Sequence, residues 1–333
     1  MEAYILDRYK KGAALRRSTL PEPSVGPDDV LIEVHAAGLN PLDLKIRDGA
    51  FKAFLPYRPP LILGHDVAGK VIRVGGNVRR FQPGDAVYAR PRDGHIGTFA
   101  TQIAVDQADI APMPGNVSME EAASIPLVGL TAWQALNGRA GLKAGQKILI
   151  HAGAGGVGTL AIQLAKHLGA HVATTTSTKN IELVKSLGAD MVVDYTREKF
   201  DSVLSDYDVV LNSLDAATLT ASLQVLKPGG KLISLSGPPD PAFAREHRLN
   251  GLLTFVMRLL SHSIRSKARA RDVRYSFLFM HASGAELEQI TTLIEAGHIH
   301  PIIDRSFAFD QMNEALSYLA TGRAKGKVVV RVR

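Results

Sequence analysis

A glycine-rich turn near the middle of the chain constrains the fold more than any other feature. Gly153, Gly155 and Gly158 follow the pattern G-x-G-x-x-G, directly after the apolar segment KILIHA and at the start of the amphipathic segment GVGTLAIQLAKHLG. A strand that turns sharply into a helix brings free backbone N–H groups and the positive end of the helix close to a pyrophosphate. In this context the motif predicts a dinucleotide-binding βαβ unit.

The segments after this turn alternate between strand and helix patterns. HVATTT, MVVDY, DVVLNSL and KLISLSG have strand patterns, whereas NIELVKSLG and LTASLQVLKPGG have helical patterns. Such alternation is typical of a parallel sheet with helices on both faces. From Pro126 onward the chain therefore has the pattern of an α/β domain.

The first third of the chain has a different pattern. VLIEVHAAG, DVAGKVIRVGG, DAVYARP and TFATQIAV are β segments separated by glycine and proline turns. Near the C-terminus, AELEQITTLIEAG and MNEALSYLATG have helical patterns, and KVVVRV has that of a closing strand. A chain of 333 residues exceeds the usual size of one hydrophobic core, so we expect two domains that share a cleft, the first of them mostly β.

The end of the second predicted strand indicates which dinucleotide binds. An NAD-preferring site places Asp or Glu there to hold the ribose hydroxyls, but this chain has Ser177, Thr178, Lys179 and Asn180 instead. Hydroxyl groups and a cation can bind the 2′-phosphate of NADPH through charge-assisted hydrogen bonds. Ser177 or Thr178 can also cap a helix, and this role is compatible with phosphate binding. We therefore predict NADPH as the cofactor.

Composition excludes several classes of protein. The chain has no cysteine, so it can form neither a disulfide nor a cysteine-ligated zinc site. No apolar run is long enough for a transmembrane helix, and the N-terminus lacks a secretion signal, so we expect a cytoplasmic protein. The net charge of +7 comes from basic residues spread along the chain, except for a cluster at 245–274, and we expect no nucleic-acid binding.

Four stretches together resemble a known family. They are AAGLNPLDLKIRDG, LGHDVAGKVIRVG with FQPGDAVYA, the block from AASIPLVGLTAWQAL through AGAGGVG, and GRAKGKVVV. The whole chain resembles the zinc-free quinone oxidoreductase and enone (2-alkenal) reductase branch of the medium-chain dehydrogenase/reductase superfamily. The resemblance implies a GroES-like, mostly β catalytic domain of residues 1–125 and 281–333, and a Rossmann domain of residues 126–280. It also implies hydride transfer from NADPH to a quinone or an α,β-unsaturated carbonyl.

The resemblance also bears on metal binding. Zinc-dependent members of the superfamily have cysteine where this chain has Asn40, and GHE where it has Gly64-His65-Asp66. A catalytic zinc usually needs three protein ligands, so a histidine and a carboxylate alone are insufficient. We expect a metal-independent enzyme in which His65 is a buried, hydrogen-bonded residue near the cleft.

Three residues are candidates for the chemistry: Lys45, Asn40 and Tyr57. The resemblance places Lys45 on the lysine of an NPxDxK motif, which contacts the cofactor ribose and the substrate side of the cleft. An ammonium group there would stabilise the enolate or hydroquinone anion that forms as hydride arrives. The alternative is a surface lysine on a helix. Solvent or Tyr57 would return the proton.

The remaining cofactor contacts are also carried over by motif position. Thr131 is expected near the nicotinamide, Tyr195 near the adenosine, Leu235 near the nicotinamide ribose and Arg323 near the pyrophosphate, although a basic helix C-terminus also explains Arg323. The full predicted cofactor set is Lys45, Thr131, Gly153, Gly155, Gly156, Val157, Gly158, Ser177, Thr178, Lys179, Asn180, Tyr195, Leu235 and Arg323.

Two alternatives to a soluble enzyme remain open. One is a non-catalytic NADPH-binding protein. The other is a peripheral membrane protein, because LLTFVMRLLSHSIRSKARARDVR joins an apolar stretch to a run of cations. For that segment we favour a helix that caps the substrate cleft and has a solvated basic side. The apolar segment YSFLFM predicts an edge strand that pairs with its copy in a homodimer.

Overall fold

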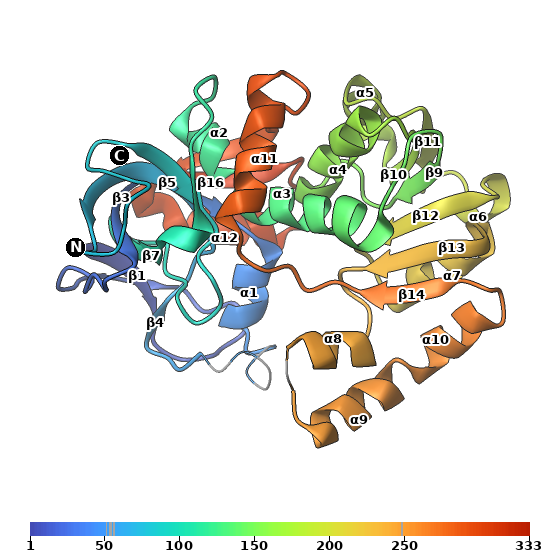
Figure 1. The fold of residues 1–333 in the computed structure, drawn as a ribbon, viewed down its shortest axis with the longest axis horizontal. Helices are drawn as coiled ribbons and strands as arrows, with labels where there is room; N and C mark the ends of the chain where they lie inside the picture. The colour runs from blue at the N-terminus through green and yellow to red at the C-terminus, as the bar shows by residue number, and fades with distance from the viewer. Residues whose placement is uncertain (51, 53–54, 56, 248) are drawn as a thin grey trace. The chain divides into compact units, whose positions relative to one another are not determined.

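The structure, a computed structural model, describes residues 1–50, 52, 55, 57–247 and 249–333. The chain divides into two compact units, one made of Met1–Leu130 with His281–Arg333 and the other of Thr131–Met280. Each unit has its own sheets and its own hydrophobic core (Figure 1).

The second unit is built on a six-stranded sheet in the order β11-β10-β9-β12-β13-β14, in which every pair is parallel. The strands are β9 (Lys147–Ile150), β10 (His171–Thr176), β11 (Met191–Asp194), β12 (Tyr207–Asn212), β13 (Leu226–Ser234) and β14 (Arg274–Phe277). Helices α4 (Gly156–His167), α5 (Ile181–Ser186), α6 (Phe200–Val203) and α7 (Ala216–Val225) alternate with the first five strands. The prediction of a Rossmann-like parallel sheet is confirmed.

Helix α4 packs on this sheet through one apolar side. Leu160, Ala161 and Leu164 recur at helical spacing, and all three are buried. Burying a leucine side chain stabilises the fold by roughly 1.5–3 kcal/mol relative to leaving it exposed. This packing fixes the start of α4 next to the end of β9, which is where the glycine-rich turn lies.

The strand order reverses beside β9. The chain runs outward from β9 through β10 to β11, then returns to the other side of β9 with β12 and continues to β13 and β14. The loops that leave the carboxyl ends of β9 and β12 therefore diverge. In parallel sheets of this kind, ligands bind at such a switch point.

The structure differs from the sequence prediction just before β13. The segment LTASLQVLKPGG was predicted to be helical throughout, but α7 ends at Val225 and β13 begins at Leu226. Pro228 explains the early end, because proline cannot donate the helical hydrogen bond and forces the residue before it into an extended conformation.

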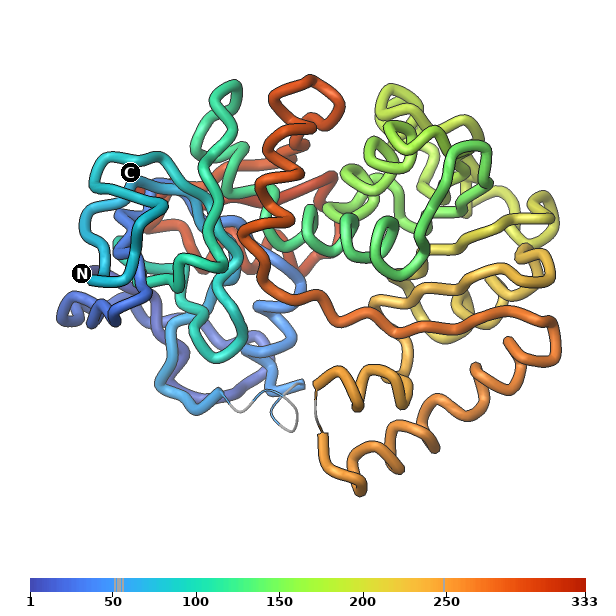
Figure 2. Tube along the Cα trace, in the orientation of Figure 1, coloured from blue at the N-terminus to red at the C-terminus, as the bar shows by residue number. Residues whose placement is uncertain are grey.

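The basic segment before β14 forms three short helices. They are α8 (Pro241–Glu246), α9 (Gly251–Leu260) and α10 (His262–Arg269). Figure 2 shows α9 and α10 as one nearly continuous run of the chain. Within the described part of the chain, no helix is both long enough and apolar enough to span a bilayer.

The first unit is rich in sheet and has the predicted GroES-like character. An antiparallel sheet in the order β2-β1-β4 contains β1 (Glu2–Leu6), β2 (Arg16–Thr19) and β4 (Leu61–Ile62). A seven-stranded sheet has the order β15-β16-β3-β5-β6-β8, with β7 paired to β3. Its strands are β3 (Asp29–Leu39), β5 (Asp66–Val74), β6 (Ala86–Ala89), β7 (Gln102–Asp106), β8 (Ile110–Pro112), β15 (Ile303–Ala308) and β16 (Lys327–Arg331).

The closing strand β16 pairs with β3, so the C-terminal segment completes the sheet of the first unit. Helices α1 (Pro41–Arg47), α2 (Met119–Ala123), α11 (Gly284–Glu295) and α12 (Met312–Ala320) belong to this unit. Helix α3 (Pro126–Trp133) begins in the first unit and ends in the second, and a seven-residue π-helix, Gln134–Ala140, follows it. The pairing of β16 with β3 brings Lys327 next to the end of β3.

Candidate active site

The glycine-rich turn has the geometry that a dinucleotide needs. A Cβ atom on Gly153 would lie 2.0 Å from the Thr174 hydroxyl oxygen, and one on Gly158 would lie 2.4 Å from the carbonyl oxygen of Ala152. Ala152 itself has a left-handed backbone, with φ of 53°. Only glycine therefore fits at these two positions, and the turn stays close to both β10 and α4.

No side chain caps the N-terminus of α4, so its first N–H groups are available to a ligand. Gly155 is the N-cap residue and has no side chain, so no side-chain hydrogen bond caps the twelve-residue helix. The first N–H groups of a helix have no partner within the helix, and together with the helix dipole they favour an anion. Gly156 and Val157 lie in this first turn, as expected for a pyrophosphate site.

His151 fixes the strand end from which the turn starts. Its two ring nitrogens lie 3.2 Å from the Thr175 hydroxyl and 3.0 Å from the Ser222 hydroxyl. Burial lowers the pKa of His151 to about 4, so the ring is neutral at physiological pH. His151 anchors the turn, and sequence reasoning missed it because its partners Thr175 and Ser222 lie on other elements.

Asn212 is a buried polar residue at the switch point whose side chain suits a ligand. It ends β12 and is fully buried, yet neither its side-chain nitrogen nor its side-chain oxygen has a hydrogen-bond partner in the structure. A buried amide without partners costs free energy, so its donor and acceptor call for a bound molecule or water. Strand β12 pairs directly with β9, which precedes the glycine-rich turn. The residues at the switch point therefore fit a bound dinucleotide.

The predicted 2′-phosphate patch follows β10. Ser177 is half-buried, and Lys179 is exposed in the short 3₁₀ helix Thr178–Asn180. Asn180 donates a hydrogen bond to the Ser177 hydroxyl at 3.3 Å, and its own side-chain oxygen is buried without a partner. The contacts of Ser177 and Lys179 with a 2′-phosphate stay a prediction.

An acidic residue lies beside this patch, although the sequence around β10 contains none. Asp194, at the end of β11, accepts hydrogen bonds from Thr178 and Thr196, and these bonds hold its pKa below its usual range. The carboxylate is nearly buried, and Arg197 lies 3.7 Å from it. The hydroxyl of Thr178, one of the residues of the predicted 2′-phosphate patch, is therefore already donated to Asp194. Arg197 is a second cation that sequence reasoning missed.

Two other predicted cofactor residues lie at the carboxyl ends of strands in this unit. Tyr195 follows β11 and is 64% exposed, so its ring can cover an adenosine. Leu235 follows β13, and its N–H donates to the carbonyl oxygen of Asn212 at 2.8 Å. Thr131, in α3, is buried. Tyr195 and Leu235 therefore lie on the same edge of the sheet as the glycine-rich turn.

The first unit contains a buried polar cluster around Asn40 and Asp66. The side-chain amide of Asn40 donates to Asp66 at 2.9 Å, and Asp66 also accepts from the Leu127 N–H at 2.7 Å. Lys327 donates to Asp66 at 2.9 Å, to Asn40 at 2.6 Å and to the carbonyl oxygen of Leu39 at 2.9 Å. The Lys327 ammonium thus makes three hydrogen bonds while its side chain is only 5% exposed.

His65 belongs to the same region and is fully buried, in line with the prediction that it is buried and hydrogen-bonded. Its Nδ1 lies 2.6 Å from Asp43, which also accepts a hydrogen bond from the Asn40 N–H at 2.7 Å. The Nε2 of His65 is buried without a partner in the structure. Within the described residues, no group of three or more His, Cys, Asp or Glu side chains could hold a metal ion.

Lys45 and Tyr57 are the other two candidates for the chemistry. Lys45 is exposed near the C-terminal end of α1. Tyr57 is half-buried, and its hydroxyl accepts a hydrogen bond from the Gly94 N–H at 3.2 Å and donates to Asp93 at 3.4 Å. Burial, followed by the charge of Asp93, raises the pKa of Tyr57 to about 12. The phenol is therefore neutral at physiological pH and can donate a hydrogen bond.

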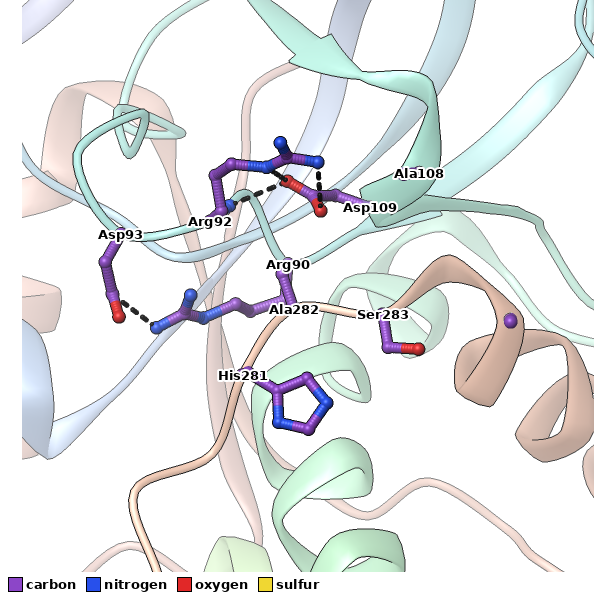
Figure 3. Close-up of a pocket in the computed structure, with 9 residues that line it drawn as sticks. Arg90, Arg92, Asp93, Ala108, Asp109, His281, Ala282 and Ser283 are labelled. Atoms are coloured by element: carbon purple, nitrogen blue, oxygen red, sulfur yellow. Dashed lines mark hydrogen bonds and ion pairs between the residues drawn. The ribbon is translucent and has the colours of Figure 1, made fainter. Parts of the chain in front are cut away.

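A cavity of about 310 Å³ lies in the first unit next to the partners of Tyr57 (Figure 3). Arg90 donates to Asp93 at 2.7 Å, and Arg92 makes two side-chain hydrogen bonds with Asp109. His281 lies below Arg90 in Figure 3 and also lines the cavity. None of these lining residues was predicted from the sequence, because they come from segments almost 200 residues apart.

Arg323 is exposed after α12 in the first unit, and its contact with the pyrophosphate stays a prediction. Together, a glycine-rich turn at the switch point of a doubly wound sheet and a GroES-like β unit in the same chain define a two-domain, nicotinamide-dependent dehydrogenase.

Comparisons with known proteins agree with this class. A model described as an alcohol dehydrogenase GroES-like domain matches residues 26–115, and one described as a zinc-binding dehydrogenase matches residues 187–330. The 2-methylene-furan-3-one reductase of Solanum lycopersicum is 38% identical over 99% of this chain and 79% of that protein. The chloroplastic NADPH-dependent alkenal/one oxidoreductase of Arabidopsis thaliana is 36% identical, with the same two coverages of 99% and 79%. The solved quinone oxidoreductase of Coxiella burnetii matches with a TM-score of 0.87 and 32% identity, over 100% of this chain and 99% of that one.

The chain belongs to the medium-chain dehydrogenase/reductase superfamily, in its quinone oxidoreductase and enone reductase branch. It is an oxidoreductase that uses a nicotinamide cofactor.

Proposed function

We propose that the protein transfers hydride from NADPH to a quinone or to an α,β-unsaturated carbonyl compound. The observation that carries this proposal is the glycine-rich turn at the switch point, where the N-terminus of α4 has no side-chain cap and the buried amide of Asn212 has no hydrogen-bond partner among the described residues. The proposed class of hydride acceptor, an enone or a quinone, is taken from the names of the similar proteins.

The residues of the second unit would bind the cofactor in an extended form. The first turn of α4 binds the pyrophosphate, while Ser177 and Lys179 bind the 2′-phosphate. Tyr195 covers the adenosine. Asn212 supplies one donor and one acceptor to the nicotinamide half, because it ends the strand next to β9. Bound NADPH supplies the hydride.

The residues of the first unit would stabilise the charge that develops on the acceptor. The ammonium of Lys45 favours the enolate or hydroquinone oxyanion, because opposite charges attract strongly where water is excluded. The neutral phenol of Tyr57 would donate its single O–H to the same oxygen in exchange for its hydrogen bond to Asp93, and it or solvent returns the proton. Asn40 holds Asp66 and the end of β3 in place through its hydrogen bonds.

A panel of quinones, 2-alkenals and cyclic enones, with NADPH consumption followed by absorbance, tests this proposal. Turnover of at least one class is expected. Cofactor binding without turnover of any class would instead favour a non-catalytic NADPH-binding protein.

We also propose that the enzyme works without metal. Lys327 already neutralises Asp66, and an ammonium beside that carboxylate repels a divalent cation. Dialysis against a strong chelator should therefore leave kcat within twofold of its starting value, as an order-of-magnitude bound on a site with no cysteine. Loss of activity on dialysis and its return with zinc would contradict metal independence.

Lys179→Ala is expected to weaken NADPH binding by roughly tenfold to a hundredfold, because a hydrogen bond to a charged group contributes about 1.5–3 kcal/mol. The exposure of Lys179 favours the lower end of this range. Turnover with NADH should hardly change, since NADH lacks the 2′-phosphate. Titration of both cofactors against the wild type and the variant measures this selectivity.

Lys185→Ala is the matched control, because Lys185 is an exposed lysine on the neighbouring helix α5. It should leave both affinities unchanged. Equal losses of NADPH and NADH affinity in Lys179→Ala, or a wild type that prefers NADH, would show that the patch does not select the cofactor.

Strand β14 is an edge strand of the sheet of the second unit and is paired with β13 on one side. We propose that its other side pairs with a second copy in a homodimer.

We propose a cytoplasmic location from the composition of the chain, although the similar Arabidopsis protein is chloroplastic.

A further inference from the structure

Helix α9 has an unusual distribution of apolar side chains. Among the described residues, half of the exposed large hydrophobic side chains lie on this one helix: Leu252, Phe255, Val256, Leu259 and Leu260, with exposed fractions between 39% and 72%. The spacing of the first four is three, one and three residues, so they share one side of the helix. An isolated exposed leucine is ordinary, but a continuous apolar stripe marks an interaction site.

The opposite side of the same run holds it to the second unit. Met257, Ser261, Ile264 and Ala268 are buried, at spacings of four, three and four residues. Ile264 and Ala268 belong to the core that also contains Val210 and Leu223. Helices α9 and α10 therefore bury the same side, and they leave the other side exposed along their common run.

The charge of this run has one sign. Between Glu246 and Asp272 the sequence contains no acidic residue, whereas it contains the basic residues Arg248, Arg258, Arg265, Lys267, Arg269 and Arg271. Lys267, Arg269 and Arg271 are exposed, and Arg265 is half-buried. We call the exposed residues of 252–271 the α9–α10 surface. Its first half is apolar except for the exposed Arg258, and its second half is cationic.

We propose that the α9–α10 surface docks on an anionic lipid bilayer. A helix with an apolar side and adjacent cations lies in the interface of a membrane, with its apolar side among the acyl chains and its cations at the headgroups. The helices stay peripheral, because no described helix can span the bilayer. This inference adds an attachment site to the proposed enzyme and does not depend on its substrate.

The charge pattern argues against a second copy as the occupant. A twofold contact would place this acid-free, cationic segment against its own copy, and like charges would repel. The cleft-capping role that the sequence favoured for this segment stays a prediction, and its basic side is exposed as that prediction expects. An anionic bilayer offers acyl chains to the apolar half of the surface and anionic headgroups to its cationic half.

The test measures binding of the full chain to vesicles of phosphatidylcholine with and without phosphatidylserine by co-sedimentation. The wild type is expected to bind the anionic vesicles and to be released by high salt, which screens the cations. Phe255→Ser with Leu259→Ser should lower the partition coefficient by a factor on the order of a hundred, because each side chain contributes about tenfold. Replacing Arg265, Lys267 and Arg269 with glutamine should lower it by a similar factor, about fivefold for each cation.

Met191→Ser with Val203→Ser is the matched control, because both side chains are exposed hydrophobics of the same unit outside α9 and α10. This variant should bind like the wild type, and equal melting temperatures should show that all variants fold. Absence of wild-type binding to anionic vesicles, or full binding by Phe255→Ser with Leu259→Ser, would overturn the proposal. A dimer mass in light scattering that falls to a monomer mass in that variant would assign the surface to a second copy instead.

Discussion

Lys45→Ala is expected to lower kcat by roughly a hundredfold to a thousandfold while weakening NADPH binding much less. Removing one group that stabilises a developing oxyanion typically costs about 2.7–4 kcal/mol of transition-state stabilisation. The structure leaves Lys45 exposed near the end of α1, so its ammonium is available to a ligand. Steady-state kinetics give kcat, and fluorescence titration gives the dissociation constant of NADPH.

Lys10→Ala is a suitable control, because Lys10 is another exposed lysine of the first unit and lies outside the predicted site. It should leave both quantities unchanged. An unchanged kcat in Lys45→Ala would make Lys45 an ordinary surface lysine. A loss in NADPH affinity as large as the loss in kcat would assign it to cofactor binding alone.

Lys327→Met is expected to lower the free energy of unfolding by about 3–5 kcal/mol. The substitution leaves the buried carboxylate of Asp66 without its cation, and an unpaired buried charge is far more costly than a missing surface ion pair. The hydrogen bonds that Asp66 accepts from Asn40 and the Leu127 N–H remain, so the lower end of the range applies. Denaturant titration measures the difference.

A double-mutant cycle identifies the cause. Adding Asp66→Asn to Lys327→Met removes the unpaired charge and should recover part of the lost stability. Lys325→Met changes a neighbouring lysine outside the cluster and should alter stability by no more than about 0.5 kcal/mol. If Lys327→Met and Lys325→Met had equal effects, the buried ion pair would contribute nothing specific.

Local patterns made much of the second unit predictable. Gly153, Gly155 and Gly158 specify a turn between strand and helix, and the structure places all three in that turn. The patterns of β11 and β12 are visible in the sequence because parallel strands buried on both faces are rich in apolar residues, and β10 is visible because its Val172 and its threonines are β-branched residues that favour strands. The absence of an acidic residue after β10 could also be predicted, because the end of β10 follows the glycine-rich turn within a short stretch of sequence.

The polar cluster of the first unit could not be predicted in the same way. Lys327 reaches Asn40 and Asp66 only because β16 pairs with β3, and these partners are more than 250 residues apart in sequence. Asp194 and Thr178 meet for a similar reason, since β10 and β11 are neighbours in the sheet. A single sequence gives residue types and local periods but not the register of distant strands.

Helix α9 marks another limit. Its apolar period predicts an amphipathic helix but not which side faces the core. The structure buries Met257 and exposes Phe255 and Leu259. Asn212 marks a third limit, because an asparagine at the end of a strand looks ordinary until its partners are counted.

The most direct test of the central claim is to follow a labelled hydride. The metal-free enzyme is incubated with NADPH deuterated at the transferred C4 position and a 2-alkenal, and the product is examined by NMR. Direct transfer predicts one deuterium on the β-carbon of the saturated product and none on the α-carbon, which takes its proton from water or from Tyr57. No oxidation of NADPH with any enone or quinone, or a product without deuterium on the β-carbon, would contradict the proposed function.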